Sequence, residues 1–83
     1  GGDIKALIIR MDRVPYIDQS GIYALEEAIF DLRAQNIEVI LTGLQEQPLD
    51  QLTSIDIIPD LVPKDDIFEN VEGAFAYLKK ELQ

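Results

Sequence analysis

The amino-acid sequence predicts a small α/β domain built on a mainly parallel sheet flanked by helices. Two apolar segments rich in β-branched residues, 4–11 and 37–42, lack the polar alternation of a half-exposed strand. A helical pattern of apolar residues lies between them, which is the order of two parallel strands joined by a crossover helix. Because both strand segments are apolar throughout, we expect helices to cover both faces of the sheet.

Composition limits what the domain can do. The 83 residues suffice for one domain near the lower size limit, and 47% of them are apolar. Sixteen acidic and seven basic residues give a formal charge of -9, which repels nucleic acids and anionic lipids. The sequence has no histidine and no cysteine, so it lacks the commonest general base and zinc ligand and any thiol nucleophile. We therefore expect no enzyme, no metal or other cofactor, no nucleic-acid partner and no direct membrane insertion.

The first half of the chain predicts a strand, a loop, a helix and a second strand. Pro15 ends the first apolar segment, because proline lacks an amide hydrogen and disfavours helix in the residue before it. From Ser20 to about Gln35 the apolar residues recur at helical spacing, and Asn36 is expected to end this helix in a left-handed conformation. The residues expected on the core side of the helix are Ile22, Leu25, Ile29 and Leu32, with Ala28 beside them.

The next segment predicts a short helix and a short third strand. Pro48 suits the first turn of a helix that stops before Pro59. Leu61 and Val62 lie between two prolines, so we expect them to form only a short strand at an edge of the sheet. The apolar residues of the short helix are Leu49, Leu52 and Ile55.

A final helix is expected to begin after Asn70, which is a suitable N-cap. Glu72 near its start and Lys79 and Lys80 near its end suit the helix dipole. The residues expected on its core side are Val71, Ala74, Phe75, Leu78 and Leu82.

The first strand is expected to need a neighbour. A strand that is apolar on both faces should not lie at an open sheet edge. We therefore expect that a segment belonging beside it is missing from this chain, and that residues 1–3 are a cloning remnant or a cut linker. The isolated chain is then expected to recruit a strand there, with a homodimer as one outcome.

Candidate functional residues gather where the strands end, because ligands of open α/β sheets bind at the carboxyl ends of the strands. Asp12 follows the first strand, and Thr42 and Gly43 end the second strand. A four-residue turn precedes the first helix, and Asp18 or Ser20 in it is expected to cap that helix, so that replacing Ser20 by alanine costs about 1 kcal/mol. We call this segment the Asp18 turn; it consists of Asp18, Gln19, Ser20 and Gly21.

Two aromatic residues lie off the core side of the first helix. Tyr23 and Phe30 point roughly 100° or more away from the core residues, and Glu26 and Glu27 flank them. With Tyr16 in the preceding loop they form a candidate partner-binding surface, and its acidic flank predicts a basic partner. The alternative is that Tyr23 and Phe30 pack beneath a loop or against a missing amino-terminal segment.

Two other functions fit the residues less well. A receiver domain would use an acidic pocket such as Asp12 and Asp18 with Lys64, but it needs an aspartate after its middle strand, where this chain has Thr42. A nucleotide site needs a glycine-rich phosphate loop, whereas Gly43 is isolated.

The order of these segments resembles the STAS domain. The first strand, the Asp18 turn and the following helix resemble the family's signature region. Residues 37–43 resemble its next strand, 52–58 its short helix and following turn, and 67–71 the start of its final helix. The resemblance implies the fold of anti-sigma-factor antagonists. It also implies that residues 4–83 are the C-terminal portion of the domain, because the family has further elements ahead of its signature strand.

Membership of this family implies a regulatory protein-interaction module without catalysis. STAS domains occur as soluble bacterial anti-sigma-factor antagonists and as cytosolic tails of SulP-type anion transporters, the sulfate permease family. Asp18 and Gly21 match the family's turn. The phosphorylated serine of the antagonists follows the aspartate directly, and this chain has Gln19 at that position.

Three segments favour the transporter tail over the soluble antagonist, which is the alternative. Residues 10–18, 24–27 and 67–68 look more like bacterial SulP tails. The apolar runs are far shorter than the ~20 residues that cross a bilayer, so the anion path would lie in other segments. We therefore expect a domain at the cytoplasmic face of the bacterial inner membrane. Its partners would be the transmembrane domain of the same transporter and other cytosolic proteins.

Overall fold

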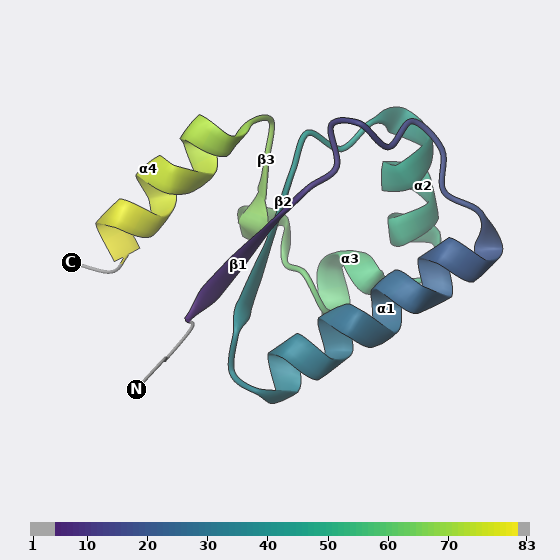
Figure 1. Ribbon diagram of the computed structural model, residues 1–83, viewed down its shortest axis with the longest axis horizontal. Coiled ribbons are helices and arrows are strands. Elements are labelled where there is room, and N and C mark those ends of the chain that lie inside the picture. Colours follow the sequence, from purple (N-terminus) through teal and green to yellow (C-terminus); the bar gives the residue numbers. More distant parts are fainter. Residues whose placement is uncertain (1–4, 82–83) are drawn as a thin grey trace.

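The structure, a computed structural model, describes residues 5–81 and is built on a three-stranded parallel sheet (Figure 1). The strands lie in the order β1 (Ala6–Arg10), β2 (Glu38–Thr42) and β3 (Ile67–Phe68). Helix α1 (Gln19–Ala34) joins β1 to β2, and α4 (Val71–Glu81) follows β3. Between β2 and β3 the chain forms α2 (Glu46–Ser54), α3 (Ile57–Asp60) and the 3-10 helix η1 (Lys64–Asp66). Figure 1 shows α4 on one side of the sheet and α1, α2 and α3 on the other, so the predicted α/β architecture is confirmed.

The core lies where α1 and the helices after β2 cover the central strand. Val39, Ile40 and Leu41 of β2 are completely buried, as expected for a strand covered on both faces. On α1, Ile22 and Ile29 are buried, and Leu25 and Leu32 pack against the same cluster. The predicted core side of this helix is therefore confirmed for these four residues, whereas Ala28 beside them is exposed.

β1 pairs in parallel with β2, from Ala6 opposite Glu38 to Arg10 opposite Thr42. Within residues 5–81 it has no second neighbour, and it forms one edge of the sheet. Its side chains are accordingly less buried than those of β2, and Leu7 is exposed. Residue 4 of the predicted strand lies outside the described residues. The expected neighbour of β1 and the nature of residues 1–3 stay predictions.

The third strand was predicted at the wrong place. Leu61 and Val62 form no strand; Leu61 ends α3, and the Val62 N–H donates to the Ile57 carbonyl at 2.9 Å. The two prolines enclose a compact turn whose apolar side chains fill the core and leave no extended backbone for pairing. β3 follows η1 instead, where Ile67 pairs with Leu41.

The later helices bury fewer residues than expected. In α2, Leu52 is buried, but Leu49 and the C-cap residue Ile55 are exposed. The buried face of α2 runs through Pro48 and Leu52, which are four residues apart, and Leu49 lies about 100° around the helix from Pro48. In α4, Ala74 is buried, whereas Phe75 is 60% exposed and does not belong to the core side. A position one residue after a buried one lies about 100° around the helix, which is beyond the contact with a three-stranded sheet. Leu82 lies outside the described residues.

The predictions for two helix ends, at Asn36 and Asn70, agree with the structure. Asn36 has a φ of 63°, so the predicted left-handed end of α1 is confirmed. Asn70 caps α4 as predicted, because its side-chain oxygen accepts from the Gly73 N–H at 2.9 Å.

Candidate functional site

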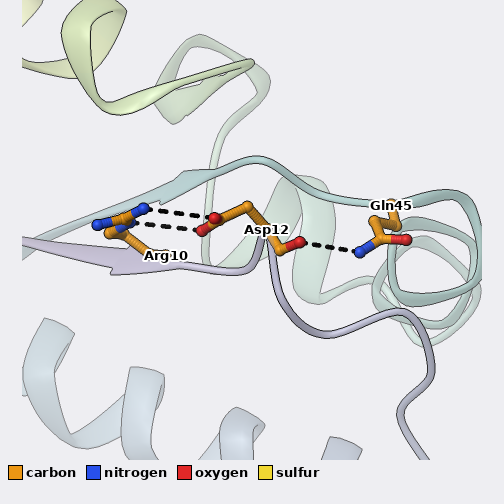
Figure 2. Close-up of polar contacts among 3 residues, drawn as sticks. All are labelled: Arg10, Asp12 and Gln45. Carbon is orange, nitrogen blue, oxygen red and sulfur yellow. Dashed lines mark hydrogen bonds and ion pairs between the residues drawn. The ribbon is translucent and has the colours of Figure 1, made fainter.

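Asp12 lies just beyond the carboxyl end of β1 and forms an ion pair with Arg10, the last residue of that strand. The Arg10 guanidinium makes a two-point contact with the Asp12 carboxylate, with Nη2 3.3 Å from Oδ2 and Nε 3.4 Å from Oδ1 (Figure 2). This hydrogen bond from Arg10 is the main reason that the pKa of Asp12 is below its usual value. Gln45 donates from its side-chain amide to the Asp12 carbonyl at 3.0 Å (Figure 2). Asp12 is thus held on both sides by polar contacts.

Thr42 and Gly43 lie beside Asp12, as their positions at the strand ends predicted. Thr42 is buried, and its carbonyl accepts from the Met11 N–H at 2.8 Å. Gly43 has a φ of 68°, a conformation that favours glycine, and a Cβ atom there would come within 2.7 Å of the Asp12 Cβ. These two residues therefore join β1 to β2, and together with Arg10, Asp12 and residues 69–72 they line a pocket at the carboxyl ends of the strands.

The loop between β1 and α1 is held by a residue that sequence analysis missed. Gln47 of α2 accepts from the Ile17 N–H at 2.8 Å and donates to the Ile17 carbonyl at 3.0 Å. Gln45 binds the same loop at Asp12. The only signal in the sequence was the presence of two glutamines a few residues after the second strand, at the end of the sheet where the first strand also ends.

The Asp18 turn forms the start of α1. Asp18 has extended backbone dihedrals and is the N-cap, and its Oδ1 accepts from the Gly21 N–H at 2.8 Å. Ser20 is an exposed residue inside the first turn, so the prediction that it caps the helix was wrong. The reason is that α1 begins at Gln19, one residue earlier than expected, and only the extended residue before a helix can cap it.

The candidate partner-binding residues line one side of α1 and the loop before it. Tyr16, Tyr23 and Phe30 are all exposed, Tyr23 by 51% and Phe30 by 62%, and none is covered by a loop within residues 5–81. Gln19 links the Asp18 turn to this surface, because its side-chain amide donates weakly to the Tyr23 hydroxyl at 3.4 Å. A partner contact at these residues stays a prediction.

A second polar cluster lies at the amino end of β2, away from the Asp18 turn. The Tyr77 hydroxyl donates to Glu38 Oε2 at 2.7 Å, which raises the pKa of Tyr77. Asp66 is only 5% exposed, and this burial, together with the adjacent Glu38 carboxyl group, raises the pKa of Asp66 to about 7. No local pattern in the sequence indicates this cluster, because Glu38 and the other two residues, Asp66 and Tyr77, come from separate parts of the chain.

None of the helices in residues 5–81 is both long enough and apolar enough to span a membrane. In the same part of the chain, no three histidine, cysteine, aspartate or glutamate side chains come together in a way that could hold a metal ion.

Comparison with protein families places this geometry in a known context. The family model described as STAS domain matches residues 1–74. The matched range includes all three strands, the Asp18 turn and α1, and it ends inside α4. No curated protein sequence matches the chain.

Proposed function

The chain belongs to the STAS domain family, and from this premise we propose that it is a non-catalytic regulatory module that acts by binding other proteins. Within the family, we assign it to the cytosolic tails of SulP-type anion transporters. It would lie at the cytoplasmic face of the bacterial inner membrane and bind the transmembrane domain of its own transporter and other cytosolic proteins.

The observation that carries this assignment is the residue after Asp18. In the soluble antagonists this position holds the serine whose phosphorylation controls partner binding, whereas this chain has Gln19. An amide cannot be phosphorylated, and the Gln19 side chain is instead directed to Tyr23. This supports a module that binds its partner constitutively, as a permanently attached domain does.

The rigidity of the surface supports a binding role. Asp18 caps α1, and Gln47 holds Ile17 at the end of the loop, so the backbone on both sides of the Asp18 turn is fixed. Tyr16 and Tyr23 are exposed next to this turn. A surface that is ordered before binding loses less conformational entropy when the partner arrives.

The coding region upstream of Gly1 tests the transporter assignment. Several apolar segments of about 20 residues ahead of this domain are the expected result. A start codon close to Gly1 would contradict the assignment and favour the soluble antagonist.

Phosphorylation tests the same assignment independently. After incubation with a bacterial cell extract and ATP, mass spectrometry is expected to find no phosphate on the Asp18 turn. Stoichiometric phosphate on Ser20 that alters partner binding would contradict the assignment and support the soluble antagonist. Such a phosphate is physically feasible, because Ser20 is exposed at the amino end of α1, where negative charge is tolerated.

A further inference from the structure

An open groove lies between α1 and the turn that joins α2 to α3. Tyr23 and Phe30 form its apolar wall on α1, and Ile55 and Leu61 form the opposite wall. Tyr23 and Phe30 are seven residues apart, so they share one face of α1 and span about 10 Å along it. The groove therefore offers an apolar surface about two helical turns long.

Four acidic side chains surround this apolar surface. Glu26 and Glu27 lie between the two aromatic residues on α1, and Asp56 and Asp60 line the opposite side. Within residues 5–81, none of the four forms an ion pair, and the groove is lined by no lysine or arginine. Four unpaired acidic groups around exposed aromatic rings create a strongly negative local potential, which a cationic ligand would relieve.

We propose that this groove binds a basic amphipathic segment of a partner protein. The aliphatic side chains of the bound segment cover Tyr23 and Phe30, and the lysine or arginine side chains of the segment reach the four acidic groups. This inference rests on the proposed function, because it assigns the partner contact of the regulatory module to one groove and defines the chemistry of the bound segment. It extends the contact beyond the residues that the sequence indicated, to the side formed by Ile55, Asp56, Asp60 and Leu61.

The negative charge of the domain favours a basic segment over the other ligands that the groove could bind. A second copy of the chain carries the same formal charge of -9, so pairing through this groove would bring like charges together. Anionic lipids and nucleic acids are repelled for the same reason. Aromatic residues are enriched in protein interfaces, and Tyr23 and Phe30 supply the apolar anchors that a polypeptide needs and a small inorganic cation does not.

The probe for this groove is a synthetic amphipathic peptide of about 14 residues, roughly four helical turns, with leucine on one face and lysine on the other. The chain contains no tryptophan, so a single tryptophan in the peptide reports binding by fluorescence. A peptide with glutamate in place of every lysine tests the need for positive charge. A polylysine peptide of equal charge, which lacks the apolar face, tests for attraction by charge alone.

Two variants of the groove separate its apolar and charged parts. Phe30→Ser removes one aromatic anchor, and its matched control is Phe75→Ser, because Phe75 is similarly exposed but lies on α4. Glu27→Gln combined with Asp60→Asn removes two charges of the groove, and Asp50→Asn combined with Asp65→Asn removes two charges outside it. Circular dichroism checks that each variant is folded.

We expect both groove variants to bind the lysine–leucine peptide at least about fivefold more weakly, and both controls to bind it as the parent does. We also expect the glutamate peptide not to bind and polylysine to bind more weakly than the amphipathic peptide. Equal losses in groove variants and controls, or no binding of the amphipathic peptide, would overturn the proposal. The upstream coding region can contradict the transporter assignment without affecting this result, so the two proposals fail separately.

Discussion

The side-chain amide of Gln47 and the backbone of Ile17 pair with each other through two hydrogen bonds, of 2.8 Å and 3.0 Å. An amide side chain has both a donor and an acceptor, so it can pair with a peptide group much as a neighbouring strand would. Through this contact α2 fixes the loop that leads into the Asp18 turn, although the two residues are 30 positions apart. The geometry of the turn therefore depends on α2 as well as on its own sequence.

Replacing Gln47 by alanine is expected to lower the free energy of unfolding by about 1–2 kcal/mol, because two half-buried backbone groups lose their partners. Hydrogen exchange should become faster at Ile17 and in the loop before it. Gln51→Ala is the control, since the Gln51 side chain lies on the same helix and forms no hydrogen bond within residues 5–81. Equal effects of the two changes would show that the Gln47 contact is unimportant.

Asp18, and not Ser20, is expected to control the stability of α1. Asp18→Ala removes the acceptor of the Gly21 N–H and should cost about 1 kcal/mol in urea denaturation. Ser20→Ala should change stability by less than about 0.5 kcal/mol, because Ser20 is exposed within the helix and alanine has the higher helix propensity. A larger loss from Ser20→Ala than from Asp18→Ala would contradict the assigned cap.

Alanine is expected to have opposite effects at two glycines. Gly43→Ala should destabilise the domain by about 2 kcal/mol or more, because the residue has a positive φ and its new Cβ would meet Asp12 at 2.7 Å. Gly73→Ala should stabilise it by about 0.5 kcal/mol, since Gly73 lies in α4 and a Cβ there has only ordinary contacts. Thermal unfolding of the two variants measures whether each change raises or lowers stability. A Gly43→Ala variant as stable as the parent would refute the close approach of Gly43 to Asp12.

Neighbouring residues on α1 are expected to differ sharply in their contribution to stability. Ile29 is completely buried, so Ile29→Ala should cost about 2–5 kcal/mol. Phe30 is 62% exposed, and Phe30→Ala should cost less than about 1 kcal/mol. Denaturant unfolding of both variants makes the comparison. If the two losses were similar, Phe30 would be a core residue and could not serve as a binding anchor.

Stability is expected to fall as the pH rises between about 4 and 7. The pKa of Asp66 is raised from 3.8 to about 7 in the folded domain, mainly by burial and also by the adjacent Glu38. In this range the folded state retains a proton that the unfolded state has lost, so the free energy of unfolding decreases with pH.

Asp66→Asn keeps the position neutral and tests this dependence. At pH 8 it should raise stability by about 1 kcal/mol, or the Tm by roughly 4–8 °C, and it should flatten the profile between pH 4 and 7. Asp65→Asn is the control, because Asp65 is the exposed neighbour. A variant profile that still falls as steeply as that of the parent would show that another group is responsible.

Much of the fold could be predicted because its largest elements carry strong patterns. The apolar residues of β1 and β2 and the helical spacing of α1 place these elements within two residues of their observed bounds. β3 could not be found in the same way, because a strand of two residues has no period. The third strand was predicted at Leu61 and Val62 because both are apolar. Their apolar character instead reflects packing in the core.

The candidate site could be predicted in part, for a related reason. The Asp18 turn could be placed at the start of α1, and the exposure of Tyr23 and Phe30 follows from the helical period. Gln47 binds Ile17, and Tyr77 binds Glu38, across 30 or more positions. Tertiary partners of polar side chains leave no local pattern, so these contacts appear only in the folded structure.

The parallel pairing of the strands also determines how fast the domain can fold. Ala6 of β1 pairs with Glu38, 32 residues further along the chain, and Leu41 of β2 pairs with Ile67, 26 residues further. No bond between strands can therefore form until a long segment has closed, whereas the hydrogen bonds of α1 are local and form on a timescale of about 1 μs or less. Refolding should accordingly show helical signals ahead of sheet closure, with an overall rate in the range of mixed α/β domains and slower than that of helical bundles.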